Sequence, residues 1–125
     1  MEILKGKVVK GDGRGGVIGF PTLNIPYNGD LSGVFVARVF SGEKQYPAAA
    51  HIGPRPTFED KQPICELHIL DFDGELGLGS DLEVEFLEQI REVQKFDSVQ
   101  DLAAQLALDV SFAKSWYNSM ENKSL

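Results

Sequence analysis

Cysteine, long hydrophobic runs and late glycines are scarce in this sequence. Its 125 residues include one cysteine, Cys65, which excludes an internal disulfide framework and any zinc or iron–sulfur site built from several cysteines. So few cysteines are typical of a reducing compartment, and we expect a cytoplasmic protein. No stretch approaches the ~18 apolar residues that a spanning helix needs, and the N-terminus lacks a signal-peptide core. We therefore expect no membrane partner.

Glycine and proline are confined to one part of the chain. All 13 glycines and all six prolines lie within residues 1–79. The first two thirds must therefore turn often, whereas the last third is free to form long regular elements. A chain of 125 residues fits one domain. We expect a single domain over residues 1–125, acting as a monomer.

Charged residues are distributed along the chain as unevenly as glycine. Residues 1–58 carry seven Lys or Arg against four Asp or Glu, whereas residues 59–125 carry five against fifteen, so the net charge of −7 divides into +3 and −10. An acidic chain of this kind lacks the basic face that nucleic-acid binding requires. We expect no nucleic-acid partner, and we expect most late carboxylates to lie on solvated faces.

Short apolar runs separated by turn residues predict β-strands in the first two thirds. The expected strands cover residues 3–9, 34–40, 45–52, 64–71 and 82–87, and Pro21 and Pro26 hold residues 20–26 extended. A turn at residues 41–44 predicts that the second and third of these strands form a hairpin. Five or six short strands at close spacing predict a mainly β fold, either a small antiparallel barrel or a sandwich.

The apolar period changes after residue 97. Ser98 followed by Asp101 is a typical helix start. Apolar residues then recur at helical spacing, at Val99, Leu102, Ala103, Leu106, Val110, Ala113 and Tyr117. We predict an amphipathic C-terminal α-helix over about 98–117 that packs on a barrel of about residues 3–96, with a frayed tail over 118–125.

The glycine-rich segment GDGRGGVIGFPTLN, residues 11–24, is the strongest local signal. Glycine-exposed backbone N–H groups can line a phosphate-binding concavity, to which Arg14 adds a forked donor. The Lys-Ser/Thr ending of a P-loop is absent and no helix follows, which disfavours both a P-loop and a Rossmann dinucleotide site. A phosphate site here would lie on a β-framework; a plain turn is the alternative.

Thr22 and Asn24 are two apart in this extended segment, so a hydroxyl and an amide carbonyl point the same way. Mg²⁺ takes one or two protein oxygens and completes its shell with water and substrate phosphates. The pair is therefore a candidate metal site beside a phosphate loop. The alternative is that both side chains only hydrogen-bond the turn backbone.

Glu66 is the candidate general base. Strand alternation places Ile64, Glu66, His68 and Leu70 on one face, opposite Cys65, Leu67, Ile69 and Asp71. Large aliphatic neighbours can hold a carboxylate partly desolvated, with a raised pKa. The alternative is a solvated edge strand with a Glu–His pair. His51 and His68 alone are too few for a metal site.

Five motifs occur in order between about residue 4 and about residue 109. They are GDGRGG-VIG-FPTLN, Gly33-Val34-Phe35, IGPRPTF at 52–58, ELHILDF at 66–72 and IREVQKF at 90–96. Together they resemble the ATP-dependent riboflavin kinase (flavokinase) family. The resemblance implies a six-stranded antiparallel Greek-key barrel followed by a helix. It also implies transfer of the ATP γ-phosphate to the ribityl 5′-hydroxyl of riboflavin, giving FMN and ADP. In bacteria this domain is usually the C-terminal half of a bifunctional enzyme with an adenylyltransferase domain.

The resemblance also assigns roles to residues. Glu66 matches the catalytic base, Thr22 and Asn24 match the Mg²⁺-binding pair, and Arg91, Gln94 and Phe96 fall where the flavin is held. The expected nucleotide-binding residues are Gly11, Gly13, Arg14, Gly15, Gly19, Pro21, Thr22, Ile69 and Asp71.

Three positions depart from the family pattern. Gly16 stands where a Lys or Arg is usual, Gly77 where a Tyr packs by the nucleotide, and Val93 where an acidic residue is usual. These departures motivate an alternative function, a catalytically lapsed flavin- or nucleotide-binding barrel. A protein-interaction domain with an acidic face is a further alternative.

Overall fold

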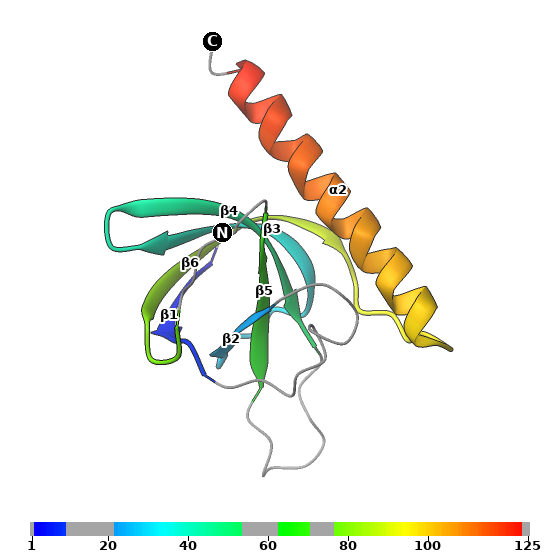
Figure 1. The fold of residues 1–125 in the computed structure, drawn as a ribbon, viewed down its shortest axis with the longest axis horizontal. Coiled ribbons are helices and arrows are strands. Elements are labelled where there is room, and N and C mark those ends of the chain that lie inside the picture. The colour runs from blue at the N-terminus through cyan, green and yellow to red at the C-terminus, as the bar shows by residue number, and fades with distance from the viewer. Residues whose placement is uncertain (1, 10–21, 54–62, 71–76, 124–125) are drawn as a thin grey trace.

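The chain forms six strands and one long helix in a computed structural model that describes residues 2–9, 22–53, 63–70 and 77–123 (Figure 1). The elements are β1 (Ile3–Lys7), β2 (Leu23–Pro26), β3 (Gly33–Ser41), β4 (Lys44–Ile52), β5 (Ile64–Ile69), β6 (Asp81–Arg91) and α2 (Val99–Lys123). The mainly β class and the C-terminal helix are thus as predicted. No helix in the described ranges combines the length and the apolar character that crossing a membrane requires.

The strands pair antiparallel in the order β1-β6-β3-β4-β5-β2. The part β6-β3-β4-β5 has the Greek-key order, because three consecutive strands are followed by a fourth that returns beside the first. The two edge strands then meet, since the Val9 N–H donates to the Asn24 carbonyl over 2.8 Å. The sheet is therefore a nearly closed Greek-key barrel, which confirms the fold implied by the family resemblance.

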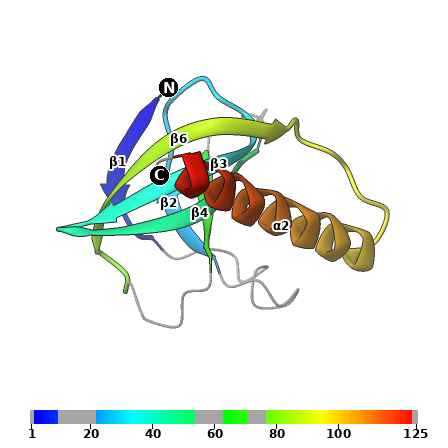
Figure 2. The ribbon, with the colours of Figure 1, turned by 90° about the horizontal axis from the view of Figure 1, so that it is seen from above.

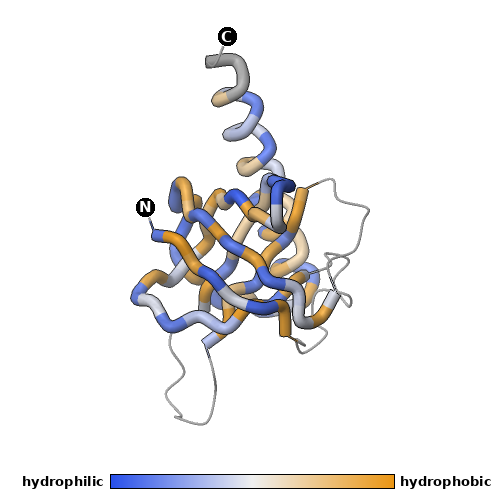
Figure 3. Tube along the Cα trace, turned by 90° about the vertical axis from the view of Figure 1, so that its left-hand side faces the viewer, coloured by the Kyte–Doolittle hydropathy of each residue, from blue (hydrophilic) through white to orange (hydrophobic). Residues whose placement is uncertain are grey.

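Alternation along the strands divides the barrel into two apolar layers, and the regular change of hydropathy along the strands is visible in Figure 3. The inner layer is built around Phe86, whose ring meets those of Phe35 and Tyr27 edge-on at 5.5 and 6.3 Å between centroids. A smaller layer lies outside, where α2 covers β3 and β4 (Figure 2). Its buried residues are Val36, Ala49, Leu70 and Ala113.

The helix begins where the sequence predicts. The Ser98 hydroxyl oxygen accepts a hydrogen bond from the Asp101 N–H over 3.0 Å, which satisfies one of the unpaired donors of the first turn. The predicted end near residue 117 is wrong, because α2 continues to Lys123. No glycine or proline follows residue 79, so neither of the two strongest helix breakers occurs in this stretch.

Strand bounds differ from the prediction where pairing decides them. β6 was expected to end at residue 87 but runs to Arg91, because β3 pairs with it from Glu83 to Arg91, while β1 pairs only with residues 81–85. The predicted hairpin of β3 and β4 is confirmed, with Gly42 at its turn in a left-handed conformation (φ 60°).

Candidate functional site

One row of residues crosses five strands on a single face of the barrel. Asn24 lies opposite Glu66, Glu66 opposite His51, His51 opposite Val34, and Val34 opposite Arg91. Directly opposed residues of an antiparallel sheet project to the same side. The adjacent row, Leu23, Leu67, Ala50 and Phe35, faces the inner core. The row from Asn24 to Arg91 therefore faces outward, and it links candidate metal, base and flavin residues that are far apart in the sequence.

Asn24 is fixed at the barrel seam. Its carbonyl accepts the Val9 N–H, and the residue is only 9% exposed. The half-buried Glu66 is its partner on β5, and the half-buried Thr22 immediately precedes β2. A hydroxyl and an amide oxygen beside a carboxylate are hard donors of the kind Mg²⁺ prefers, so these residues fit that ion.

The face of β5 that carries Glu66 is as predicted, whereas the alternative of a solvated edge strand is wrong. β5 pairs with β4 on one side and β2 on the other. His68 is 7% exposed, and Leu70 belongs to the buried layer beneath α2. Burial, followed by the neighbouring His51, lowers the pKa of His68 to about 4, although Asp109 opposes the shift. The His68 imidazole is therefore neutral at pH 7.

The opposite face of β5 turns into the barrel. Burial, with a smaller effect of the Glu66 charge, raises the pKa of the Cys65 thiol well above its ordinary value, so Cys65 is no nucleophile. Ile69 packs against the inner core on this same face. Its side chain thus lies on the other side of the strand from Glu66, and its expected contact with a nucleotide stays a prediction.

Arg91, at the end of β6, is held by the helix. Its Nε lies 2.9 and 3.2 Å from Asp109 Oδ1 and Oδ2, its second terminal nitrogen lies 2.8 Å from Oδ2, and its first donates to the Glu92 carbonyl over 3.0 Å. The guanidinium carbon also lies 5.8 Å from the centre of the Phe96 ring. The structure therefore brings together two of the three expected flavin residues, and the third, Gln94, is exposed.

The remaining expected nucleotide residues lie outside the described ranges. They are Gly11, Gly13, Arg14, Gly15, Gly19, Pro21 and Asp71. Of the three departures from the family pattern, Gly16 also lies outside. Gly77 is exposed, with no atom of the described residues within 4 Å of a Cβ added to it, and Val93 is half-buried.

Two residues of the site were missed from the sequence. His51 gave no signal as a neighbour of Glu66, because cross-strand register depends on pairing between distant segments. Asp109 did give a signal in the sequence, since this carboxylate occurs between Leu106 and Ala113 in the apolar stripe of the helix. A charge at a core position indicates a buried partner, but the pattern does not say which one.

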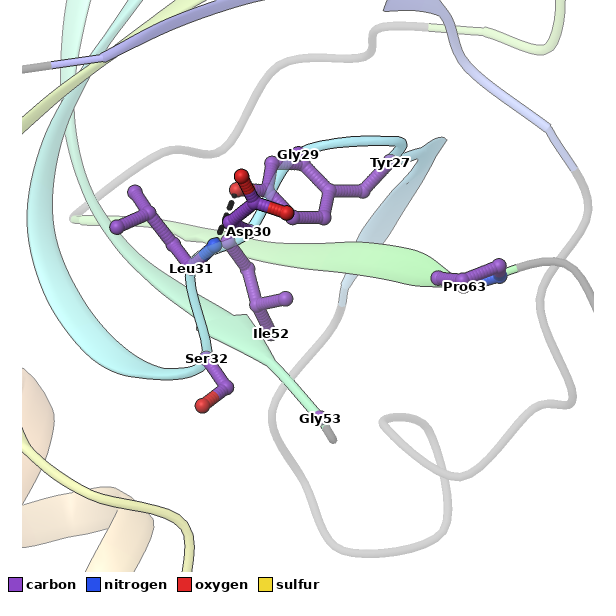
Figure 4. Close-up of a pocket in the computed structure, with 8 residues that line it drawn as sticks. All are labelled: Tyr27, Gly29, Asp30, Leu31, Ser32, Ile52, Gly53 and Pro63. Atoms are coloured by element: carbon purple, nitrogen blue, oxygen red, sulfur yellow. Dashed lines mark hydrogen bonds between the residues drawn. The ribbon is translucent and has the colours of Figure 1, made fainter. Parts of the chain in front are cut away.

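A pocket of about 270 Å³ opens where β4 and β5 meet the connection between β2 and β3 (Figure 4). The Tyr27 hydroxyl shapes it, accepting the Leu31 N–H over 2.8 Å and donating to Glu2 Oε1 over 3.0 Å. Burial raises the pKa of Tyr27 to about 12, so the hydroxyl remains a donor. Ile52 in its wall directly follows His51, the middle residue of the row.

Comparison with known proteins assigns the chain to a family. The riboflavin kinase family model, Flavokinase, matches residues 2–117. The chain therefore belongs to the riboflavin kinase family, whose members are phosphotransferases.

Individual relatives and solved structures are similar to the chain over most of its length. The chain is 38% identical over 118 residues to the bifunctional riboflavin kinase/FMN adenylyltransferase of Escherichia coli K12, covering 91% of this chain and 37% of that protein. Riboflavin kinase from Trypanosoma brucei superposes with a TM-score of 0.63 at 28% identity, over 93% of this chain and 79% of that one. A crystal structure described as a macrolide-efflux protein from Streptococcus pneumoniae superposes with a TM-score of 0.81 at 34% identity, over 91% and 38%. The chain spans less than two fifths of the E. coli relative, 37% of its length.

Proposed function

We propose that this chain is a riboflavin kinase, which transfers the terminal phosphate of ATP to the ribityl 5′-hydroxyl of riboflavin and gives FMN and ADP. The observation that carries the proposal is the pairing of Asn24 with Glu66 on the outer face of a flavokinase-family barrel. That pairing puts a proton acceptor beside a candidate metal ligand, which is what phosphoryl transfer to an alcohol requires.

Glu66 acts as the general base. Its carboxylate takes the proton of the 5′-hydroxyl while that oxygen forms a bond to the γ-phosphorus. The bond from the γ-phosphorus to the bridging oxygen breaks, and its electron pair leaves with ADP. Most of the rate enhancement comes from holding the two substrates in line, because the transferred phosphoryl group needs little covalent help.

Thr22 and Asn24 would hold Mg²⁺, which when bound neutralises charge on the terminal phosphates. The nucleotide is held by the glycine-rich segment, residues 11–19, together with Pro21, Ile69 and Asp71. The flavin is held by Arg91, Gln94 and Phe96. These assignments rest on the family resemblance; the position of Asn24 beside Glu66 and the contact of Arg91 with Phe96 support them.

A catalytically lapsed binder is not favoured, because Asn24 and Glu66 are both present and paired. We further propose a monomer in the cytoplasm. In its longer relatives, whose names pair riboflavin kinase with FMN adenylyltransferase, the FMN made by this domain would be the substrate of the second activity.

Incubation with riboflavin and ATP, with and without Mg²⁺, followed by chromatographic separation of FMN, tests the proposal. We expect FMN only when ATP and Mg²⁺ are both present. A parallel thermal-shift series with riboflavin alone and ADP alone identifies the alternatives. Stabilisation by a ligand without product would mean a lapsed binder, and no response at all would mean an interaction domain.

A further inference from the structure

The ion pair of Arg91 and Asp109 is buried and bidentate. The Arg91 side chain is 14% exposed and that of Asp109 is 2% exposed. Nε and one terminal nitrogen of the guanidinium reach the two carboxylate oxygens side by side, which is the strongest geometry available to this pair. Such a pair is costly to bury unless its geometry is well satisfied. Its value therefore lies in fixing one arrangement of β6 relative to α2.

A further hydrogen bond holds the Asp109 carboxylate in place. Gln105, one turn earlier in α2, donates from Nε2 to Asp109 Oδ1 over 3.1 Å. The opposite end of Arg91 is tied to the Glu92 carbonyl over 3.0 Å. The guanidinium is consequently locked in plane and in direction at the point where the chain leaves the barrel.

Arg91 keeps binding capacity in this arrangement. A guanidinium has five N–H donors, and the contacts within the described residues engage three, two to Asp109 and one to Glu92. Phe96 stands 5.8 Å from the guanidinium carbon. A fixed cation with donors to spare, next to an aromatic ring, suits a planar heteroaromatic ring system that carries carbonyl oxygens.

We propose that Asp109 is a positioning residue for flavin binding. It acts through Arg91, so that α2 presents the guanidinium and Phe96 to the ring system of riboflavin. The inference rests on the proposed kinase function. It extends the flavin site from the segment after β6 to a helix residue that makes no direct contact with the substrate.

The helix has a second attachment, which makes the proposal separable from folding. The Tyr117 hydroxyl donates to the Ala37 carbonyl, and Ala113 is buried against β3 and β4. Loss of the Asp109 carboxylate should therefore loosen Arg91 while α2 stays on the barrel.

The test compares Asp109→Asn with Asp101→Asn, an exposed carboxylate in the first turn of the same helix. We expect Asp109→Asn to raise the KM for riboflavin about tenfold, with the KM for MgATP within twofold of the parent; Asp101→Asn should change neither. Because Asp109→Asn leaves a buried guanidinium without its counter-charge and could unfold, a second variant replaces both partners, Arg91→Met with Asp109→Leu. Apolar replacement of a buried pair commonly preserves stability, and this variant should also bind riboflavin weakly.

Quenching of riboflavin fluorescence on binding measures affinity without turnover. An unchanged riboflavin affinity in either folded variant would overturn the inference. So would a parallel loss of riboflavin and MgADP affinity with a lower melting temperature, because that pattern describes a purely structural pair. Absence of FMN formation by the parent chain would instead overturn the proposed function, and the fluorescence titration would still report on Asp109.

Discussion

Asn24 and Glu66 lie directly opposite each other on β2 and β5, the first 9% exposed and the second half-buried. Opposed residues of an antiparallel pair keep their Cβ atoms about 5 Å apart on one face. The candidate metal ligand and the candidate base are therefore held by strand pairing rather than by loops. Sites built on paired strands hold their geometry more closely than sites on loops.

Glu66→Gln should abolish most turnover without loss of binding. Glutamine keeps the size and hydrogen-bonding reach of the side chain but accepts no proton, so we expect kcat to fall about 100-fold or more. Affinity for riboflavin and for MgADP should stay within twofold. Rapid-quench assays of FMN formation and equilibrium titrations measure the two separately. Unchanged turnover would remove Glu66 from the mechanism.

Asn24→Ala should weaken nucleotide binding only when Mg²⁺ is present. The substitution removes an amide oxygen next to Glu66, while the main-chain bond to Val9 remains. We expect about a tenfold loss of ADP affinity with Mg²⁺ and little change without it, measured by calorimetry. The control is Asn28→Ala, an exposed residue between β2 and β3. Equal MgADP affinity in Asn24→Ala and the parent would exclude the metal role.

His68 should make the fold sensitive to mild acid. Its pKa is about 4 in the folded chain and 6.5 when exposed, because burial disfavours the imidazolium. The unfolded state thus binds the proton first, so stability is fully present above pH 6.5 and is lost as the pH falls toward 4. By pH 5 the loss amounts to about 2 kcal/mol.

Urea unfolding at pH 7 and pH 5 measures this loss. His68→Gln should reduce the difference in unfolding free energy between the two pH values, because glutamine does not titrate. In NMR spectra of the parent, the His68 ring protons should keep their neutral positions down to pH 5. A His68 titration midpoint near 6.5 would contradict the burial argument.

Gly33→Ala should destabilise the barrel more than Gly42→Ala. Gly33 has φ 118°, and an added Cβ would lie 2.6 Å from the Arg91 carbonyl oxygen and 2.5 Å from Gln89 Nε2. Gly42 has φ 60°, but none of the described residues lies within 4 Å of the added Cβ. We expect a loss of about 3 kcal/mol at Gly33 and about 1 kcal/mol at Gly42, read as urea midpoints. Equal losses would mean that the contact with β6 costs nothing.

Local patterns predicted most elements. Alternation located the strands, Gly42 marked the hairpin turn, and Ser98 marked the start of α2. Local patterns failed to predict the length of an element where pairing between segments far apart in the sequence determines it. β6 is longer than its own pattern because two strands use it, and α2 is longer because nothing in its sequence stops it.

The site was predicted in part, for a related reason. Glu66 and Asn24 could be identified as chemically suitable, but their placement opposite each other depends on the register of β2 against β5. His51 and Asp109 entered the site only through partners on other elements. A sequence pattern states which face of its own element a residue occupies, and not what stands opposite.

The pairing of Ile3 with Glu85 also determines the order in which the strands can pair during synthesis. During synthesis the first strand leaves the ribosome long before its partner exists, and it must wait until β6 has been translated. The hairpin of β3 and β4 can form meanwhile, since its contacts are local. Asn24 and Glu66 can pair through β2 and β5 before that, whereas Arg91, the last residue of their row, lies at the end of β6. The candidate site should therefore be completed only after β6 has been translated.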